Sequence, residues 1–196
     1  TIIYYAPTIF KIAGFDSNIS AIYAAMGIGI INFLMTIVAI AFTDKLGRKP
    51  LLYFGLTGVM LSLVALGCAF QFEAVLGGAL KWVAVGSLAT YIICFACSLG
   101  PIGWILVSEV FPLRIRGAAM SLCTVANFAF NFLVVFSFLP LIHRIGEANT
   151  FWMFAVVSLL CIFFVYFFVP ETKGISLETI ESNWINGVSP RKFKEE

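Results

Sequence analysis

Hydrophobic and polar positions divide this chain into long apolar stretches joined by short polar segments. Five stretches carry no Asp, Glu, Lys or Arg, and they cover 17–43, 50–72, 82–108, 117–142 and 148–170. A charge at the centre of a membrane-spanning helix costs about 2.5 to 3.5 kcal/mol on insertion scales, so a bilayer selects runs of about 20 uncharged, mostly apolar residues. Each stretch is 23 to 27 residues long and predicts one transmembrane helix.

The overall composition supports this prediction. Hydrophobic residues make up 61% of the chain and charged residues only 11%, whereas soluble domains carry about 25% charged residues. A water-soluble core is therefore excluded, and the 196 residues fit an all-α membrane protein with five complete spans. The first ten residues, TIIYYAPTIF, are uncharged but too few to span a bilayer, so we expect them to be the end of a truncated sixth helix.

The short polar segments carry an uneven distribution of positive charge. With alternating spans, nine of the 12 Lys and Arg residues fall on one side: Lys45, Arg48, Lys49, Arg114, Arg116, Lys173, Arg191, Lys192 and Lys194. Only Lys11, Lys81 and Arg144 fall on the other. The positive-inside rule then places the loops 44–49 and 109–116 and the tail after 170 in the cytoplasm. We expect residues 1–169 to form the membrane bundle and 170–196 a cytoplasmic carboxyl-terminal tail.

The tail changes from an aromatic run to the segment SLETIESNWING. Ser176 followed by Glu178 favours the start of a short amphipathic helix, because both side chains stabilise a helix amino end. Its apolar side would carry Leu177, Ile180, Trp184 and Ile185.

Three side-chain amides lie well inside the apolar stretches, away from their ends. Asn127 and Asn131 are four residues apart and share one helical face, and Asn32 lies in another stretch. An amide both donates and accepts hydrogen bonds, as a sugar hydroxyl requires, and it should avoid lipid. Alternatively, these amides only bond to neighbouring helices, an interaction worth about 0.6 kcal/mol. The spacing leaves both interpretations open.

Three clusters of mixed charge flank the spans on the predicted cytoplasmic side: DKLGRK (44–49), SEVFPLRIRG (108–117) and PETKG (170–174). Topology control alone needs Lys and Arg, but the acidic residues at the span ends add nothing to orientation. Pairing between the clusters is therefore one interpretation. The other is helix-end neutralisation, since surface ion pairs contribute only about 0 to 1 kcal/mol.

Gly100, Pro101 and Gly103 interrupt the stretch 82–108, which predicts either a gating hinge or a passive kink. Cys94 and Cys97 are spaced as a CxxC pair, but inside a span they favour helix packing over redox or metal chemistry. The sequence shows no nucleophile with a base, no metal-ligand spacing and no phosphate-binding loop. We therefore expect no enzyme activity, no cofactor, no metal and no nucleic-acid partner.

Taken in order, YYAP, DKLGRK, GPIGW followed by SEVFPLRIRG, and PETKG resemble the second half of a sugar porter of the major facilitator superfamily. The tail VPETKGISLETIE is similar to that of bacterial galactose, arabinose and xylose proton symporters. The resemblance implies a carboxyl-terminal six-helix bundle that transports a monosaccharide by alternating access, with proton symport. It also implies a missing amino-terminal six-helix half as partner, and a bacterial inner membrane as location.

The resemblance also assigns roles to residues. It implies sugar contacts at Asn32, Phe95, Trp104 and Asn127, and an outer gate at Tyr4 and Tyr5. A cytoplasmic gate of salt bridges would contain Asp44, Arg48, Glu109, Arg114, Arg116 and Glu171. The chain departs from the family in two ways: the glutamine pair that precedes YY in the family would lie before Thr1, and Phe128 stands where many members carry Trp.

Other membrane functions stay open at this point. The spans contain no carboxylate, so proton coupling rests on the resemblance, and facilitated diffusion is the alternative. A channel would need a filter or charged rings, and the sequence offers only scattered amides. A sugar sensor that binds without transport would share the site residues, although such proteins usually carry a long signalling tail.

Overall fold

The computed structural model describes residues 2–14, 18–186 and 188, with the backbone alone at Asn18, Asp44, Trp184 and Ile185. The described residues form helices in this order: α1 (Ile2–Ile12), α2 (Asn18–Leu46), α3 (Arg48–Gln71), α4 (Glu73–Leu76), η1 (Gly77–Ala79), α5 (Leu80–Cys97), α6 (Leu99–Val110), α7 (Arg116–Ile145), α8 (Glu147–Phe168) and α9 (Leu177–Ile185).

The five predicted spans are confirmed as helices long and apolar enough to cross a membrane. They cover Ile19–Thr43, Arg48–Gln71, Glu73–Val110, Arg116–Ile145 and Glu147–Phe168. In two respects the prediction was incomplete. The stretch 82–108 is not one uninterrupted helix, because it is divided into α5 and α6 at Ser98. The polar segment before it, predicted as a loop, contains the short helices α4 and η1.

Helix α3 is central to the packing, because it contacts α8 along one side and α5 along another. Small residues allow this close approach: a side chain at Gly55 would collide with Ser98, which follows α5, and one at Gly67 with the indole of Trp152 in α8. Small residues at such contacts are typical of helix association in membranes, where backbones approach closely. The outer helices α2 and α7 are much less covered, with 11% of the central window of each buried against 50% for α3.

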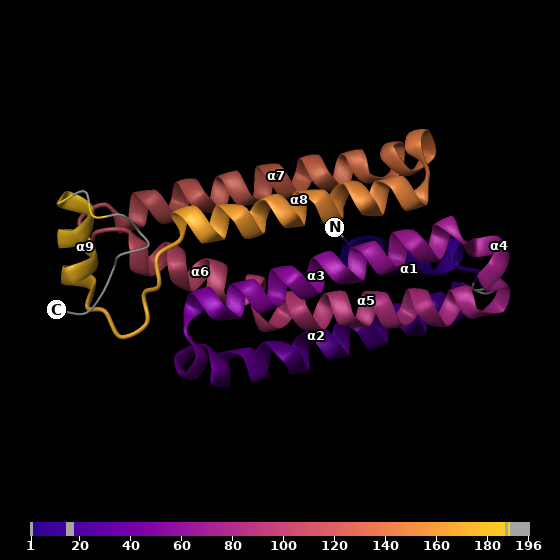
Figure 1. Ribbon diagram of the computed structural model, residues 1–196, viewed down its shortest axis with the longest axis horizontal. Coiled ribbons are helices and arrows are strands. Elements are labelled where there is room, and N and C mark those ends of the chain that lie inside the picture. Colours follow the sequence, from indigo (N-terminus) through magenta and orange to yellow (C-terminus); the bar gives the residue numbers. More distant parts are fainter. Residues whose placement is uncertain (1, 15–17, 187, 189–196) are drawn as a thin grey trace.

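The long helices run along the long axis of the molecule, with α7 and α8 side by side (Figure 1). At one end lie the α2–α3 turn, the end of α6 and α9, and at the opposite end lies α4 (Figure 1). The three charged clusters of the sequence therefore gather at one end of the bundle, as the charge distribution predicts. Which side of the membrane that end faces stays a prediction.

Helix α9 packs against α6 at this charged end. The Ser176 hydroxyl accepts a hydrogen bond from the backbone N–H of Thr179 at 3.2 Å, as a helix cap does. Ile180 is almost fully buried and anchors the helix to the bundle. The side chains of Trp184 and Ile185, predicted on the same apolar side, lie outside the described residues.

Candidate functional site

The break between α5 and α6 falls three residues before Pro101. A proline ring clashes with the carbonyl of the residue four positions earlier, which here is Cys97, and it offers no N–H to that carbonyl. Helix α5 accordingly ends at Cys97, and Ser98 takes a non-helical conformation (φ −134°, ψ −79°). The predicted hinge residues Gly100, Pro101 and Gly103 thus lie in the first turns of α6, just after the break rather than at it.

A cavity of about 550 Å³ lies next to this break, between α5, α6 and α7. Its lining residues are Phe95, Leu99, Gly100, Trp104, Asn127, Phe130, Asn131 and Val134. Three of the four sugar contacts implied by the resemblance, Phe95, Trp104 and Asn127, are therefore in one place. Aromatic rings cover the apolar face of a ligand and amides bond its hydroxyls, so this lining suits a small polyhydroxylated molecule. Its volume lies in the range of about 300 to 1,000 Å³ that small-molecule sites occupy.

One face of α7 supplies the polar wall of the cavity. Asn127, Phe130, Asn131 and Val134 recur at intervals of three and four residues, which places them on one side of the helix. The sequence prediction missed Phe130, Val134 and Leu99 as lining residues. The helical spacing from Asn127 would have identified the first two, because positions three and seven residues further on share its face.

A smaller cavity adjoins the first and shares Leu99, Trp104 and Asn127 with it. Gly103 of the predicted hinge and Cys123 of α7 complete part of its wall. The segment after the break therefore forms the side of the cavity over two turns of α6, and any movement of α6 would change the cavity's shape.

The fourth predicted sugar contact, Asn32, and the predicted outer-gate residues, Tyr4 and Tyr5, do not line this cavity. Asn32 is half-buried in α2. Its backbone carbonyl accepts a hydrogen bond of 2.8 Å from the Thr36 hydroxyl. Tyr5 ties α1 to α7, because its hydroxyl donates to the carbonyl of Val135 at 3.0 Å. Tyr4 next to it is 70% exposed. Their roles as sugar ligand and outer gate stay predictions.

An ion pair connects two of the charged clusters. The Arg48 guanidinium, at the start of α3, lies 2.9 Å from a carboxylate oxygen of Glu109, in the last turn of α6. The other oxygen of Glu109 accepts a hydrogen bond of 2.6 Å from the Thr172 hydroxyl, which belongs to the third cluster and is buried. All three clusters therefore meet at Glu109. Because both partners of the ion pair are mostly covered, it should be stronger than a fully exposed pair.

Glu171 binds the amino end of α3. Its carboxylate accepts hydrogen bonds of 3.0 Å from the backbone N–H groups of Arg48 and Lys49, which is the favourable position for a negative charge at a helix start. This approach requires Gly47, which has φ +91° and whose added Cβ would lie 3.0 Å from a Glu171 carboxylate oxygen. Glu171 was predicted in the salt-bridge gate; the structure shows that it caps α3, and its part in a salt bridge stays a prediction.

The other predicted gate residues are less engaged. Arg116 donates from Nε to the carbonyl of Phe111 at 3.2 Å and so braces the loop after α6. Arg114 is exposed and makes neither a hydrogen bond nor an ion pair with any residue that the structure describes. The side chain of Asp44 lies outside the described residues.

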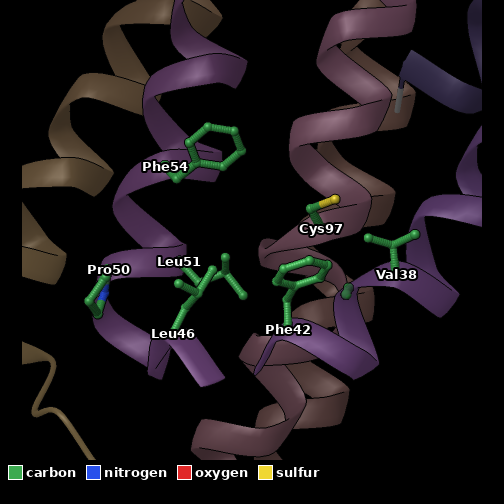
Figure 2. Close-up of a pocket in the computed structure, with 8 residues that line it drawn as sticks. Val38, Phe42, Leu46, Pro50, Leu51, Phe54 and Cys97 are labelled. Atoms are coloured by element: carbon green, nitrogen blue, oxygen red, sulfur yellow. The ribbon is translucent and has the colours of Figure 1, made fainter. Parts of the chain in front are cut away.

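A second pocket, of about 370 Å³, lies between α2, α3 and the end of α5. Figure 2 shows its walls, which include Val38, Phe42, Leu46, Pro50 and Phe54, with Cys97 at the end of α5. No lining side chain carries a hydroxyl, amide or charge. A sugar would lose its hydrogen bonds with water here without replacement, so this pocket is no candidate for the polar ligand.

Comparison with known proteins identifies the family of the chain. The family model described as "Sugar (and other) transporter" matches residues 1–184. The chain is 46% identical over 182 residues to the D-xylose-proton symporter-like 3 of Arabidopsis thaliana, covering 93% of this chain and 32% of that protein. It is 36% identical to the galactose-proton symporter of Escherichia coli K12, covering 99% and 41%, and 38% identical to the facilitated trehalose transporter Tret1 of Bombyx mori, covering 95% and 37%.

A solved structure of the proton:xylose symporter XylE, a major facilitator superfamily protein bound to 6-bromo-6-deoxy-D-glucose, matches with a TM-score of 0.81. The two are 36% identical, and the match covers 93% of this chain and 38% of XylE. The chain thus spans about a third of the length of the three D-xylose-proton symporter-like relatives from Arabidopsis thaliana. The helical bundle, the spans and the family model together show that this chain belongs to the sugar transporter family of the major facilitator superfamily.

Proposed function

We propose that this chain is the carboxyl-terminal six-helix half of a transporter that moves a monosaccharide, a hexose or a pentose, across a cell membrane by alternating access. The observation that carries the proposal is the cavity between α5, α6 and α7. It combines two amides, Asn127 and Asn131, with the rings of Phe95 and Trp104, beside a break in a membrane-spanning helix. Broken helices in transporters are where substrate contacts and moving segments meet.

The cluster around Glu109 supplies the gate of this mechanism. The Arg48–Glu109 pair joins the start of α3 to the end of α6, so α6 cannot swing away from α3 while the pair is intact. Thr172 and Glu171 attach the segment after α8 to the same place. We assign this end to the cytoplasm, on the charge distribution, and the bacterial inner membrane follows from the similarity to bacterial symporters.

Proton coupling is part of the proposal, and it is supported by the names of relatives. Proteins similar to this chain include the D-xylose-proton symporter-like and galactose-proton symporter proteins. The five uncharged stretches contain no carboxylate that could carry a proton, so coupling would use a residue of the other half. Facilitated diffusion is the second candidate, favoured by the relative named a facilitated trehalose transporter.

Uptake by the full-length protein in proteoliposomes tests the proposal. We expect saturable uptake of labelled D-xylose or D-galactose, accelerated by unlabelled sugar on the opposite side. A proton gradient should drive accumulation above equilibrium for a symporter, and it should have no such effect for a uniporter. A flux that never saturates would indicate a channel, and sugar binding without flux would indicate a sensor; either result would contradict the proposal.

A further inference from the structure

We propose that the apolar pocket between α2, α3 and α5 binds an acyl chain of an anionic phospholipid, whose phosphate headgroup lies against the basic residues around the α2–α3 turn. The proposal concerns a site separate from the sugar cavity, and it does not depend on which sugar is transported.

The residues that line the pocket run along α2 from the α2–α3 turn to Val38, so the pocket forms a slot beside this helix. Val38, Phe42 and Leu46 recur every four residues on one face of α2, and Pro50 and Phe54 form the opposite wall on α3 (Figure 2). From Val38 to Leu46 the helix rises by about 12 Å. An extended acyl chain entering beside the turn would therefore lie in contact with apolar groups over this length.

The walls of the pocket are exposed in spite of being apolar. Phe42 is 47% exposed, Leu46 53% and Phe54 62%. In a helix that crosses a bilayer, such side chains contact lipid or another apolar surface. The sugar cavity does not reach this place, because it is lined by α5, α6 and α7 and shares no residue with the pocket.

Three lysines lie at or near the α2–α3 turn, where the slot ends. Lys45 is exposed and lies three residues after Phe42, on the same side of α2. The Lys173 ammonium bonds to the Lys45 carbonyl at 2.6 Å, and the Lys49 ammonium lies 3.4 Å from the carbonyl of Tyr166. Basic residues at a cytoplasmic helix end attract the phosphates of anionic lipids.

The described acidic residues near the turn are already engaged. Glu171 accepts the backbone N–H groups of Arg48, Lys49 and Lys173, and Glu109 pairs with Arg48. Asp44 carries one further negative charge in the same turn. Counting Lys45, Arg48, Lys49 and Lys173 against Asp44, Glu109 and Glu171, four positive charges minus three negative ones leave a net charge of +1 at this turn. An anionic headgroup complements that charge better than a zwitterionic one.

Photo-crosslinking of the full-length protein tests the site. The protein is reconstituted in vesicles of phosphatidylcholine that contain a phosphatidylglycerol with a diazirine on its acyl chain. After irradiation, labelled peptides are identified by mass spectrometry. We expect labelling to concentrate at Phe42, Leu46 and Phe54, several-fold above the exposed phenylalanines Phe163, Phe164 and Phe167 of α8, which meet lipid without a pocket.

Two variants distinguish the contribution of headgroup binding from that of acyl-chain binding in the slot. Lys45→Gln should lower labelling at Phe42 and Leu46 several-fold, and Lys11→Gln, which removes an exposed lysine from α1, should not change it. Val38→Trp should fill the slot and lower labelling without loss of the phosphatidylglycerol near α8. Equal labelling of the pocket and the α8 face would overturn the proposal. So would equal labelling by a phosphatidylcholine probe, because the anionic headgroup would then have no role.

Discussion

The polar cavity beside the α5–α6 break and the apolar pocket between α2, α3 and α5 differ in one respect that decides what each of these two hollows can bind. The cavity beside the α5–α6 break places Asn127 and Asn131 opposite aromatic rings, whereas the pocket between α2 and α3 has apolar walls throughout. Of the helices that border them they share only α5, and their volumes are of the same order. In a bilayer an amide without a partner is costly, so two amides facing one cavity indicate a polar ligand or water there.

The two hollows also differ in whether their walls include a segment that is expected to move. The polar cavity is bordered by a helix break and lies between α6 and α7, and the ion pair of Arg48 and Glu109 holds one end of α6. The apolar pocket borders the unbroken α2 and α3, which a tight turn at Gly47 joins, and reaches the break only through Cys97, the last residue of α5. Opening of the charged end should therefore change access to the first hollow and leave the second nearly unchanged.

The largest effect is expected when the polar cavity is made apolar. Asn127→Leu removes an amide that bonds the ligand, and each lost bond to a buried partner costs about 1.4 to 2.8 kcal/mol, or about 10- to 100-fold in apparent affinity. Competition uptake assays in proteoliposomes measure it. Asn149→Leu is the control, because this amide bonds the carbonyl of Ile145 at an exposed helix start. Equal losses in both variants would show that the cavity is not the binding site.

Opening the charged end should distinguish the two hollows directly. Glu109→Gln weakens the pair with Arg48, and we expect a shift of about tenfold toward the state open at this end. The chain contains two reporter cysteines: Cys123 lines the smaller cavity that adjoins the polar cavity, and Cys97 lines the apolar pocket. Labelling of Cys123 by a water-soluble maleimide added on the cytoplasmic side should rise.

Labelling of Cys97 by a lipid-soluble maleimide should stay the same in the Glu109→Gln protein. Arg114→Ala removes an exposed charge of the same cluster and is the matched control. An unchanged rate at Cys123, or a parallel rise at both cysteines, would contradict the gate assignment.

The features that are set by residues close together in the sequence were predictable. The spans follow from the cost of charge in lipid, and the common end of the three clusters follows from alternation of the spans. The position of the break could have been derived as well, since the Pro101 ring acts on the carbonyl of Cys97. The prediction placed the hinge on Gly100, Pro101 and Gly103 as a group, without deriving from the proline that the helix breaks at Ser98.

Contacts between distant segments were not predictable from one sequence. A carboxylate at Glu171 is equally suited to a salt bridge and to a helix cap, and only the position of α3 decides for the cap. The same is true of Thr172, whose hydroxyl reaches Glu109 across 63 positions of the chain. Phe130 was predictable only in part. Its helical spacing placed it on the same face as Asn127, but the sequence did not show which helices pack against that face of α7.

Phe130 offers a smaller test of the cavity's boundary. Phe130→Ala removes a ring from the wall, and because one methylene in an apolar pocket changes discrimination by at least about tenfold, the ratio of hexose to pentose affinity should change by about that factor. Phe132→Ala is the matched control: Phe132 is 65% exposed, close to the 68% of Phe130, and does not line the cavity. Phe42→Ala in the apolar pocket should also leave the ratio unchanged. A shift of the ratio in either control would mean that bulk outside the cavity sets the preference.

The smallest expected effect concerns Gly47, which lies between the apolar pocket and the ion pair. Gly47→Ala introduces strain at φ +91° and also places a Cβ 3.0 Å from the carboxylate of Glu171. Gly146→Ala has similar backbone strain at φ +84° with open space around it, so it serves as the control for strain alone. Both should lower the apparent Tm in detergent, each by the equivalent of about 1 kcal/mol for the backbone. Gly47→Ala should lower it further, because Glu171 must retreat from the amino end of α3 and loses part of its capping bonds. Equal Tm values for the two variants would show that the cap adjusts without cost, and that the turn is not the rigid link between the two regions.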